Sequence, residues 1–334
     1  MQIKPIIAVT MGDPAGIGPE IIHSVFSDHS IYDSCRPLVL GDLKILEHVK
    51  KYTNSDLSFN EISQPDEGLY NRGSIDIINI TGSDIVKPGE PTKLSGKAMI
   101  DYIEFAIDLT KNNKVSAMVT CPINKAAMQL AQSEFHGHTE LLANRTKTDK
   151  YAMMLTGETL KVVLVTIHIP LKEVVEMLTT EKILETITIT NDSLIERFGI
   201  EKPSIAVAGL NPHAGEEGLF GDEEEKIIEP AVTAAKNKGI DVNGPYPPDT
   251  VYYNASKGEF DAVISMYHDQ GLIPFKMIHF SDGVNTTLGL PIIRTSVDHG
   301  TAYDITGRGI ADHRSLKEAI IMASTQATNS NKIL

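Results

Sequence analysis

Three histidines stand shortly after apolar runs that have the length and composition of buried strands. They are His168, His213 and His268. The runs before them are residues 161–167, 204–210 and 262–266. In open parallel sheets, ligands bind outside the carboxyl ends of the strands, and imidazole is the commonest metal ligand in proteins. Three imidazoles and an open position suit a catalytic divalent ion. The pattern predicts a shared metal site, and three separately hydrogen-bonded structural histidines are the alternative.

The third histidine belongs to a polar cluster, Tyr267–Gly271, that ends its apolar run abruptly. Asp269 in this cluster, and Asp249 after a proline-rich stretch, are candidates for handling the proton of a reacting group. Either carboxylate could instead orient a neighbouring histidine. The sequence does not choose between these two roles.

A further polar segment, Thr120–Lys125, follows an apolar strand expected at residues 115–119. It offers Asn124 and Lys125 as contacts for a substrate or a cofactor. A solvated helix start explains the same residues equally well, so both interpretations stay open.

His138 and Thr139 begin an expected helix that continues through Leu141 and Leu142. The backbone N–H groups and the dipole at a helix N-terminus attract anions, so these side chains could help to bind one. Helix capping by Thr139 is the structural alternative.

The N-terminal segment Met11–Glu20 reads MGDPAGIGPE and follows a first strand expected within residues 1–10. Its GIG tripeptide begins like a dinucleotide-binding fingerprint, but Ile21 stands where the third glycine should be. Pro14 and Pro19 also remove backbone donors that should hold a pyrophosphate. We therefore expect a tight strand-to-helix turn, with Pro19 in the first turn of the helix.

The rest of the pattern alternates strands and helices, which is typical of an α/β protein. The expected elements include strands at residues 37–40 and 75–80 and helices at residues 95–112 and 171–198. Residues 243–250 contain three prolines and are expected to form a loop. Residues 223–226 are expected to be a solvated helix start.

Length and composition are those of an ordinary globular protein. The 334 residues suggest two domains, and contents of 41% hydrophobic and 22% charged residues are usual for such chains. A formal net charge of -14 argues against binding of nucleic acid or of an anionic membrane, because both normally require a basic surface. No apolar run approaches a membrane span of about 20 residues. The two cysteines, Cys35 and Cys121, make no disulfide framework, and we expect a cytoplasmic protein.

Six blocks of the sequence carry a resemblance to a known family. The blocks are MGDPAGIGPE, GHTE, NPHAGE, GPYPPDT, YHDQG and VNTTLGLPIIRTSVDHGTA. In this order and spacing they resemble the 4-hydroxythreonine-4-phosphate dehydrogenase family of vitamin B6 biosynthesis, along nearly the whole chain. Two positions depart from the family pattern. Cys121 stands where many relatives have glycine or alanine, and His136 precedes the GHTE block.

The resemblance implies the two-domain α/β fold of the isocitrate and isopropylmalate dehydrogenases, with the active site in the interdomain cleft. Residues 1–125 and 286–334 would form the first domain, which carries the nucleotide-binding loop. Residues 126–285 would form the second domain, with the metal ligands and the dimer interface.

The activity that the resemblance implies is the oxidation and decarboxylation of 4-phosphohydroxy-L-threonine to 3-amino-2-oxopropyl phosphate, in pyridoxal 5'-phosphate biosynthesis. NAD, or NADP, would accept the hydride, and the divalent ion would be zinc, magnesium or cobalt. Close relatives oxidise 4-phospho-D-threonate or 4-phospho-D-erythronate, and the quoted motifs do not separate these substrates. A non-enzymatic binding protein is the alternative from another class, but it would have no need of three strand-end histidines beside a nucleotide loop.

The resemblance also assigns roles to individual residues. The metal ligands would be His168, His213 and His268, and in a homodimer His268 would come from the chain opposite the other two. The residues expected to bind the phosphorylated substrate are His138, Thr139, Lys276, Asn285 and Arg294. The residues expected to bind the cofactor are His299, Gly300, Thr301, Ala302, Asp304, Gly307 and Gly309. The catalytic candidates are Lys276, Asp249 and Asp269.

Overall fold

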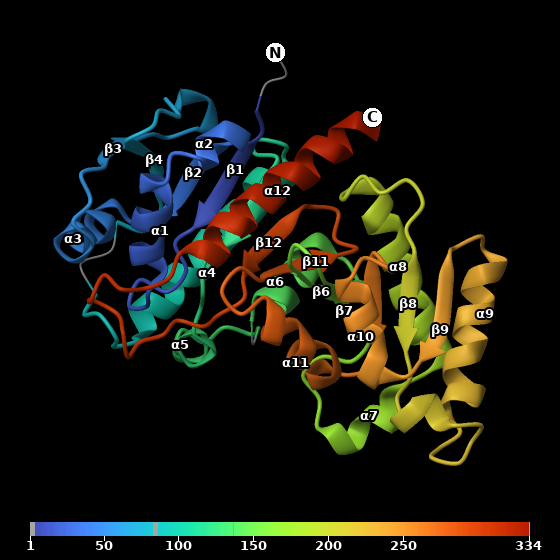
Figure 1. The fold of residues 1–334 in the computed structure, drawn as a ribbon. Helices are drawn as coiled ribbons and strands as arrows, with labels where there is room; N and C mark the ends of the chain where they lie inside the picture. Colours follow the sequence, from blue (N-terminus) through green and yellow to red (C-terminus); the bar gives the residue numbers. More distant parts are fainter. Residues whose placement is uncertain (1–3, 83–85, 136, 334) are drawn as a thin grey trace. The chain divides into compact units, whose positions relative to one another are not determined.

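The computed structural model describes residues 4–82, 86–135 and 137–333, with side chains up to Ser330 (Figure 1). The chain divides into two compact units. The first comprises Met1–Asp149 and Leu290–Lys332, and the second comprises Lys150–Gly289.

Two segments lie in a different unit from the one that the sequence suggests. Residues 126–149 belong to the first unit, where α6 (His138–Thr146) packs on α4 (Lys93–Lys111). Residues 286–289 belong to the second unit, because β11 (Val284–Leu288) pairs along its whole length with β6 (Ala152–Thr156). The interdomain location of the active site stays a prediction.

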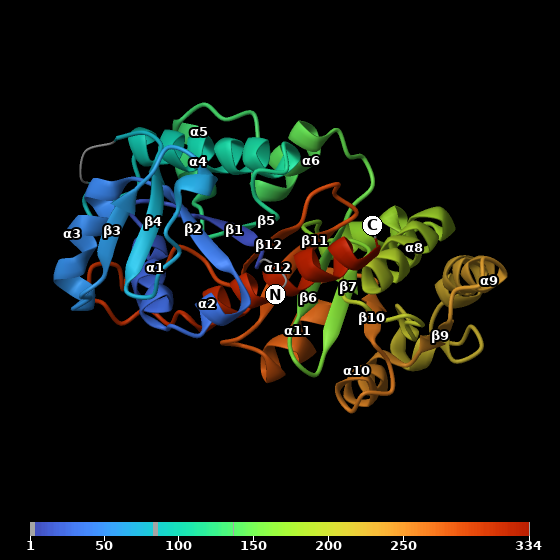
Figure 2. The ribbon, with the colours of Figure 1, turned by 90° about the horizontal axis from the view of Figure 1, so that it is seen from above.

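The first unit contains parallel strands in the order β3-β4-β2-β1-β5-β12. Their bounds are β1 Ile6–Thr10, β2 Arg36–Gly41, β3 Ser58–Glu61, β4 Ser74–Asn79, β5 Ala117–Thr120 and β12 Arg294–Val297. The other elements are α1 Gly18–Ser27, α2 Ile31–Ser34, α3 Leu43–Thr53, the 3₁₀ turn Pro65–Glu67, α5 Lys125–Leu130 and α12 Arg314–Ile333. Helices α1 and α4 lie on opposite faces of the sheet (Figure 2), so the central strands are apolar on both sides.

The second unit contains strands in the order β11-β6-β7-β10-β8-β9. β6 runs antiparallel to both of its neighbours, and the remaining pairs are parallel. The further strands are β7 Lys161–Leu164, β8 Ile205–Ala208, β9 Val242–Tyr246 and β10 Ala262–Ser265. The helices are α7 Leu171–Met177, α8 Thr180–Glu196, α9 Glu229–Asn237, α10 Pro248–Ser256 and α11 His268–Ile278.

Alternating residues of these strands enter two separate cores. Val163 packs with the helices α8 and α9 on one face, whereas its neighbours Val162 and Leu164 pack with α10 and α11 on the other. Side chains alternate between the two faces of a strand, so a parallel sheet covered on both faces needs apolar residues at every position. This requirement explains the continuous apolar runs, and the predicted α/β fold class is confirmed.

Two local predictions are wrong. Residues 243–250 are not a loop, because they supply the edge strand β9 and the start of α10, with Pro248 in the first turn. An edge strand and a first helical turn are the places where proline costs no hydrogen bond. Residues 171–198 form two helices, not one, because Thr179 caps α8 by accepting a hydrogen bond from Lys182 N at 3.2 Å.

The tight turn predicted between the first strand and its helix is confirmed. Gly12 has φ +72°, and a Cβ atom there would lie 2.4 Å from the carbonyl oxygen of Pro122. A Cβ atom at Gly18 would lie 2.1 Å from Met11 O. Pro19 occupies the first turn of α1, as expected. These glycines serve close backbone packing, which agrees with the rejection of a dinucleotide fingerprint.

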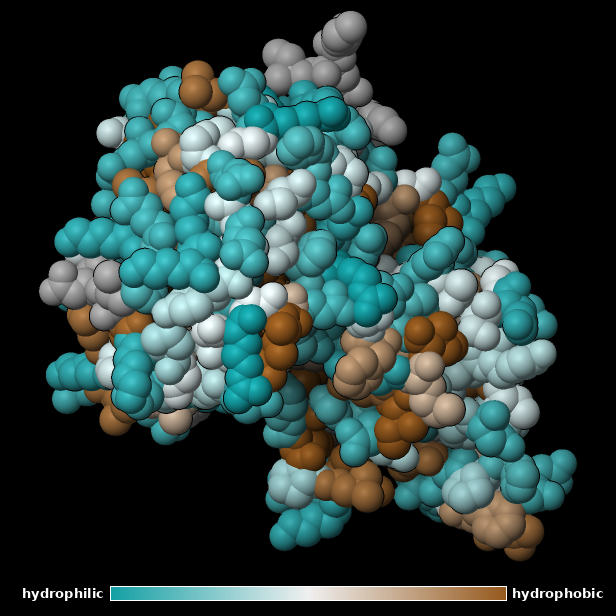
Figure 3. Space-filling view, turned by 60° about the vertical axis from the view of Figure 1, so that its left-hand side comes forward, coloured by the Kyte–Doolittle hydropathy of each residue, from teal (hydrophilic) through white to brown (hydrophobic). Residues whose placement is uncertain are grey.

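Among the helices that the structure describes, none combines the length and the apolar content needed to cross a membrane. On the face drawn in Figure 3, hydrophilic residues predominate and hydrophobic ones gather in separate patches.

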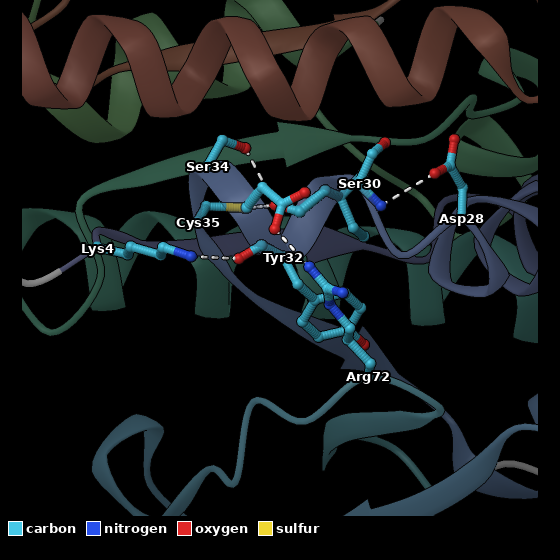
Figure 4. Close-up of polar contacts among 9 residues, drawn as sticks. Lys4, Asp28, Ser30, Tyr32, Ser34, Cys35 and Arg72 are labelled. Atoms are coloured by element: carbon cyan, nitrogen blue, oxygen red, sulfur yellow. Dashed lines mark hydrogen bonds and ion pairs between the residues drawn. The ribbon is translucent and has the colours of Figure 1, made fainter.

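Polar contacts tie the C-terminal helix to the segment after α1. Lys317 Nζ lies 2.6 Å from Asp28 Oδ2, and Ser324 Oγ donates to Ser34 O at 2.8 Å. The same segment contains α2, where Lys4 Nζ donates to the carbonyl oxygen of Tyr32 at 2.7 Å (Figure 4). The last helix of the chain is therefore held against the N-terminal part of the first unit.

His23 in α1 makes the stability of the fold depend on pH. It is completely buried, its Nε2 lies 2.8 Å from Leu46 O, and burial lowers its pKa from 6.5 to about 4. The unfolded chain therefore binds a proton more readily between these values, and stability is lost as pH falls from 6.5 towards 4. This group should cost about 2 kcal/mol of stability between pH 7 and pH 5.

Urea unfolding of the wild type and of His23→Gln at pH 5, 6 and 7 tests this expectation. The stability difference between the two proteins should shrink towards pH 5, because only in the wild type does the unfolded chain gain a proton at residue 23 that the folded chain does not take up. His29→Gln, which changes an exposed histidine nearby, is the control. A difference that stays constant with pH in His23→Gln would contradict the prediction.

Candidate active site

The three strand-end histidines come from neighbouring parallel strands of the second unit. β10 lies between β7 and β8, so the carboxyl ends of the three strands share one edge of the sheet. His168 follows β7, His213 lies in the turn Pro212–Gly215 after β8, and His268 is the first residue of α11. The strand order thus has the arrangement on which the predicted metal site depends.

The structure brings two of these histidines together within one chain. The ring centroids of His168 and His268 lie 5.5 Å apart, and both residues line a pocket of about 440 Å³. Two imidazoles that bind one ion at about 2.1 Å place their ring centroids roughly 5 Å apart, so this pair fits a shared divalent ion. Asp269 Oδ1 lies 2.7 Å from His268 Nδ1, which leaves Nε2 to face a ligand.

His213 does not join the pair. Its ring lies beside Phe220, with the centroids 6.3 Å apart. Within the described ranges of this single chain, no three His, Cys, Asp or Glu side chains are placed to hold a metal ion together.

The proposed proton-handling residues lie on α10 and α11. Asp249 and Asp269 line the same pocket of about 580 Å³ between these helices. Lys276 is on α11, two turns beyond His268, with its Nζ 5.8 Å from the centre of the Phe280 ring. Asn285 lies on β11, paired with Leu155 of β6.

A buried arginine marks a candidate anion site in the first unit. Arg294 on β12 is 3% exposed, and its guanidinium donates to Thr120 Oγ1 from Nε at 3.2 Å and from Nη2 at 2.7 Å. Burial lowers the pKa of Arg294 to about 9, which leaves it charged at neutral pH. Burial, and then Arg294 itself, hold the pKa of His138 well below its usual value. A neutral His138 and a charged Arg294 suit the binding of an oxyanion, with Thr139 in the first turn of α6.

The expected cofactor loop is held by the N-terminal turn. Glu20, which is 2% exposed, accepts hydrogen bonds from Gly307 N at 2.5 Å and from Gly309 N at 2.8 Å. Tyr303 Oη donates to Asp13 Oδ2 at 2.5 Å, and burial raises the pKa of this aspartate. Glu20 and Asp13 were not among the site residues predicted from the sequence. The one feature of the sequence that could have indicated them is the presence of two acidic residues in a glycine- and proline-rich segment.

The loop has features that fit a bound ligand. Ala302 has φ +43°, and a Cβ atom at Gly309 would lie 2.0 Å from Tyr52 O, so the backbone is tightly held on that side. A Cβ atom at Gly300 would meet nothing within 4 Å. The buried Nε2 of His299 has no hydrogen-bond partner in the part of the chain that the structure describes. Thr301 O accepts from Ile17 N at 3.1 Å, and Asp304 is exposed.

Other candidates have structural explanations. Asn124 caps α5 by accepting from Ala127 N at 2.8 Å, which favours the helix-start interpretation. Cys121 is completely buried, and burial raises the pKa of its thiol. His136 lies outside the described residues.

Comparison with known proteins decides the family. The model of the family described as pyridoxal phosphate biosynthetic protein PdxA matches residues 33–323. The chain belongs to this family. It is 58% identical over 327 residues to 4-hydroxythreonine-4-phosphate dehydrogenase of Desulforapulum autotrophicum, covering 97% of this chain and 96% of the relative. The resemblance stated from the six sequence blocks is thus confirmed.

Two further PdxA-like proteins are informative. D-threonate 4-phosphate dehydrogenase of Cupriavidus necator is 46% identical over 330 residues, which cover 97% of this chain and 98% of the relative. The crystal structure of 4-hydroxythreonine-4-phosphate dehydrogenase from Klebsiella pneumoniae is 42% identical, with a TM-score of 0.89 and coverage of 97% of this chain and 99% of that one. These relatives are dehydrogenases, and they support an enzyme rather than a binding protein.

The hydrogen bonds from Gly307 N and Gly309 N to the Glu20 carboxylate, called the Glu20 clamp below, predict a protease-sensitive variant of this PdxA chain. In Glu20→Gln, an amide NH₂ group replaces one carboxylate oxygen and faces a backbone N–H, so the loop should loosen at a cost on the order of 1–3 kcal/mol. Arg308 is exposed and lies between the two clamped glycines. Trypsin should therefore cut folded Glu20→Gln after Arg308 faster than it cuts the folded wild type.

Glu47→Gln is the matched control, because Glu47 is an exposed glutamate. Equal cleavage rates after Arg308 in Glu20→Gln and the wild type would show that the two hydrogen bonds do not hold the loop.

Proposed function

We propose that this chain oxidises 4-phosphohydroxy-L-threonine with NAD, or NADP, and releases CO₂ to give 3-amino-2-oxopropyl phosphate. The observation that carries the proposal is 58% identity to a 4-hydroxythreonine-4-phosphate dehydrogenase over 97% of the chain. The pyridoxal phosphate biosynthetic family supplies the expected context, and a cytoplasmic location remains part of the proposal.

The residues of the second unit would hold the reacting end of the substrate. His168, His213 and His268 would hold a divalent cation, zinc, magnesium or cobalt, which when bound withdraws charge from the substrate hydroxyl. Asp269 would fix the ring of His268 through its Nδ1. Asp249, or Asp269 in place of its orienting role, would take the hydroxyl proton. Lys276 would meet an anionic group of the substrate, and Asn285 would contact the substrate.

The residues of the first unit would bind anionic groups. Arg294 and His138, with Thr139 at the start of α6, would hold an oxyanion of the substrate. The loop that contains His299, Gly300, Thr301, Ala302, Asp304, Gly307 and Gly309 would hold the dinucleotide. The nicotinamide of this dinucleotide supplies the hydride acceptor when bound.

A bound dinucleotide would supply the acceptor for the hydride from the carbon that bears the hydroxyl, and the hydroxyl would give its proton to a base of the protein. The resulting ketone lies β to the carboxylate, whose bond to carbon then breaks with release of CO₂. The electron pair left on carbon finally takes up a proton.

A second candidate substrate is favoured by the 46% identical D-threonate 4-phosphate dehydrogenase. D-threonate and D-erythronate 4-phosphates carry a hydroxyl where hydroxythreonine phosphate carries an amine. A site built to hydrogen-bond one group rejects the other, because a buried partner is left unmatched.

We expect NADH formation with a kcat/KM on the order of 100-fold higher for 4-phosphohydroxy-L-threonine than for either sugar-acid phosphate. The measurement uses one preparation, both dinucleotides and each of the three divalent ions. A preference for a sugar-acid phosphate would overturn the vitamin B6 assignment. No NADH or NADPH from any of these substrates would overturn the dehydrogenase assignment itself.

We also propose a homodimer in which His168 and His213 of one chain meet His268 of its partner. Large apolar side chains on α10 and α11 are available to contact a second copy. Tyr253 on α10 is 67% exposed, Ile273 and Met277 on α11 are 60% and 83% exposed, and Phe280 just after α11 is 78% exposed. Large exposed apolar patches are typical of interaction sites. The proposal comes from the family resemblance. Within one chain His168 and His268 lie together and His213 lies apart, so a mixing experiment is needed to decide between a shared site and a site within one chain.

Mixing the inactive variants His168→Ala and His268→Ala tests the shared site. In a mixed dimer, one site would collect both defects and the other would have none, so up to about a quarter of the wild-type activity should return. If His168 and His268 of one chain served the same ion, every site would carry a defect. Absence of recovery after proven subunit exchange would therefore contradict sharing.

A further inference from the structure

The loop that carries His213 has an unusual backbone. Six consecutive residues, 213–218, have φ values of 53°, 54°, 82°, 44°, 54° and 87°. Only two of them are glycines. Side chains disfavour this left-handed region, so single residues visit it and runs are rare. Such a run persists only where surrounding contacts hold it.

The buried carboxylate of Glu224 holds the two residues that come just before Pro212 and this run, and Glu223 Oε2 also accepts from Asn211 Nδ2, at 2.7 Å. Glu224 is 4% exposed, and its Oε1 accepts from Leu210 N and from Asn211 N, both at 2.7 Å. Its Oε2 accepts from Asn211 Nδ2 at 2.9 Å. The sequence predicts a solvated helix start at residues 223–226, and for Glu224 this is wrong. The sequence does not distinguish Glu224 from the acidic residues beside it, because only the fold shows which of these side chains is buried.

The loop is built closely around this side chain. A Cβ atom at Gly215 would lie 2.8 Å from Glu224 Oε2, and one at Gly209 would lie 3.1 Å from Oε1. Glu224 also begins the π-helical turn Glu224–Ile228. Such turns are rare and often lie at functional sites.

We infer that Glu224 is a positioning residue that fixes the His213 loop for metal binding. Its hydrogen bonds reach the two residues before Pro212 and His213, where the chain leaves β8. They set the direction in which the left-handed turn starts and therefore where the imidazole lies. The inference rests on the proposed function, which makes His213 a metal ligand.

A variant that changes the charge but not the size of the side chain tests the role. In Glu224→Gln, an NH₂ group replaces one oxygen, and it faces either a backbone N–H or the amide of Asn211. Glu225→Gln makes the same change at the next residue, which is exposed, and is the matched control.

Two measurements on the full-length protein are needed. Calorimetric titration with Co²⁺ should show at least tenfold weaker binding for Glu224→Gln and wild-type binding for Glu225→Gln. In the metal-free protein, backbone amides of residues 209–218 should exchange with deuterium faster in Glu224→Gln only. Exchange tests the loop directly, without metal or activity.

The outcomes separate this inference from the proposed function. If His213→Ala binds Co²⁺ as the wild type does, the metal assignment falls and the positioning role falls with it. If His213→Ala weakens binding while Glu224→Gln does not, only the role of Glu224 is overturned. Glu223→Gln, which disturbs only the contact of Asn211 with Glu223, is the control for a further variant. Should Glu224→Gln fail to fold, Asn211→Ala removes the side-chain contacts with both glutamates. It should weaken Co²⁺ binding several-fold, and wild-type affinity would overturn the inference.

Discussion

Buried carboxylates that accept backbone N–H groups hold the loops beyond the strands in both units. Glu20 holds the loop at residues 307–309, and Glu224 holds the start of the His213 loop. Asp76 accepts from Leu69 N and Tyr70 N in the same way. A hydrogen bond to a carboxylate is stronger than a hydrogen bond between neutral groups. Part of the acidic excess of this chain therefore serves its interior.

The strand-end histidines could be predicted from the sequence, because both signals are local. A short apolar run that stops at a polar cluster indicates a buried strand and its carboxyl end, whatever the partners of that strand. His168 and His268 come close because β7 and β10 are neighbours. The strand order itself comes from the structure, since local periodicity contains no information on pairing.

The carboxylate clamps could not be predicted, because they join residues far apart in the chain. Glu20 and Gly307 are separated by 287 positions. Glu224 stands among other acidic residues, and a run of charge normally indicates a solvent-exposed surface. The edge strand β9 was hidden by its prolines for a related reason. Proline excludes a central strand, but only the sheet order shows that a strand lies at an edge.

The discontinuous first unit has a consequence for how the protein is made. The second unit, Lys150–Gly289, is continuous in sequence and has both of its cores once residue 289 has been synthesised. The first unit still lacks β12 and α12 at that moment, and the strand edge of β5 that β12 will cover is bare. An uncovered edge of this kind pairs readily with other chains. On the ribosome, the part translated first is thus the last to be completed, and the first unit depends most on protection from aggregation.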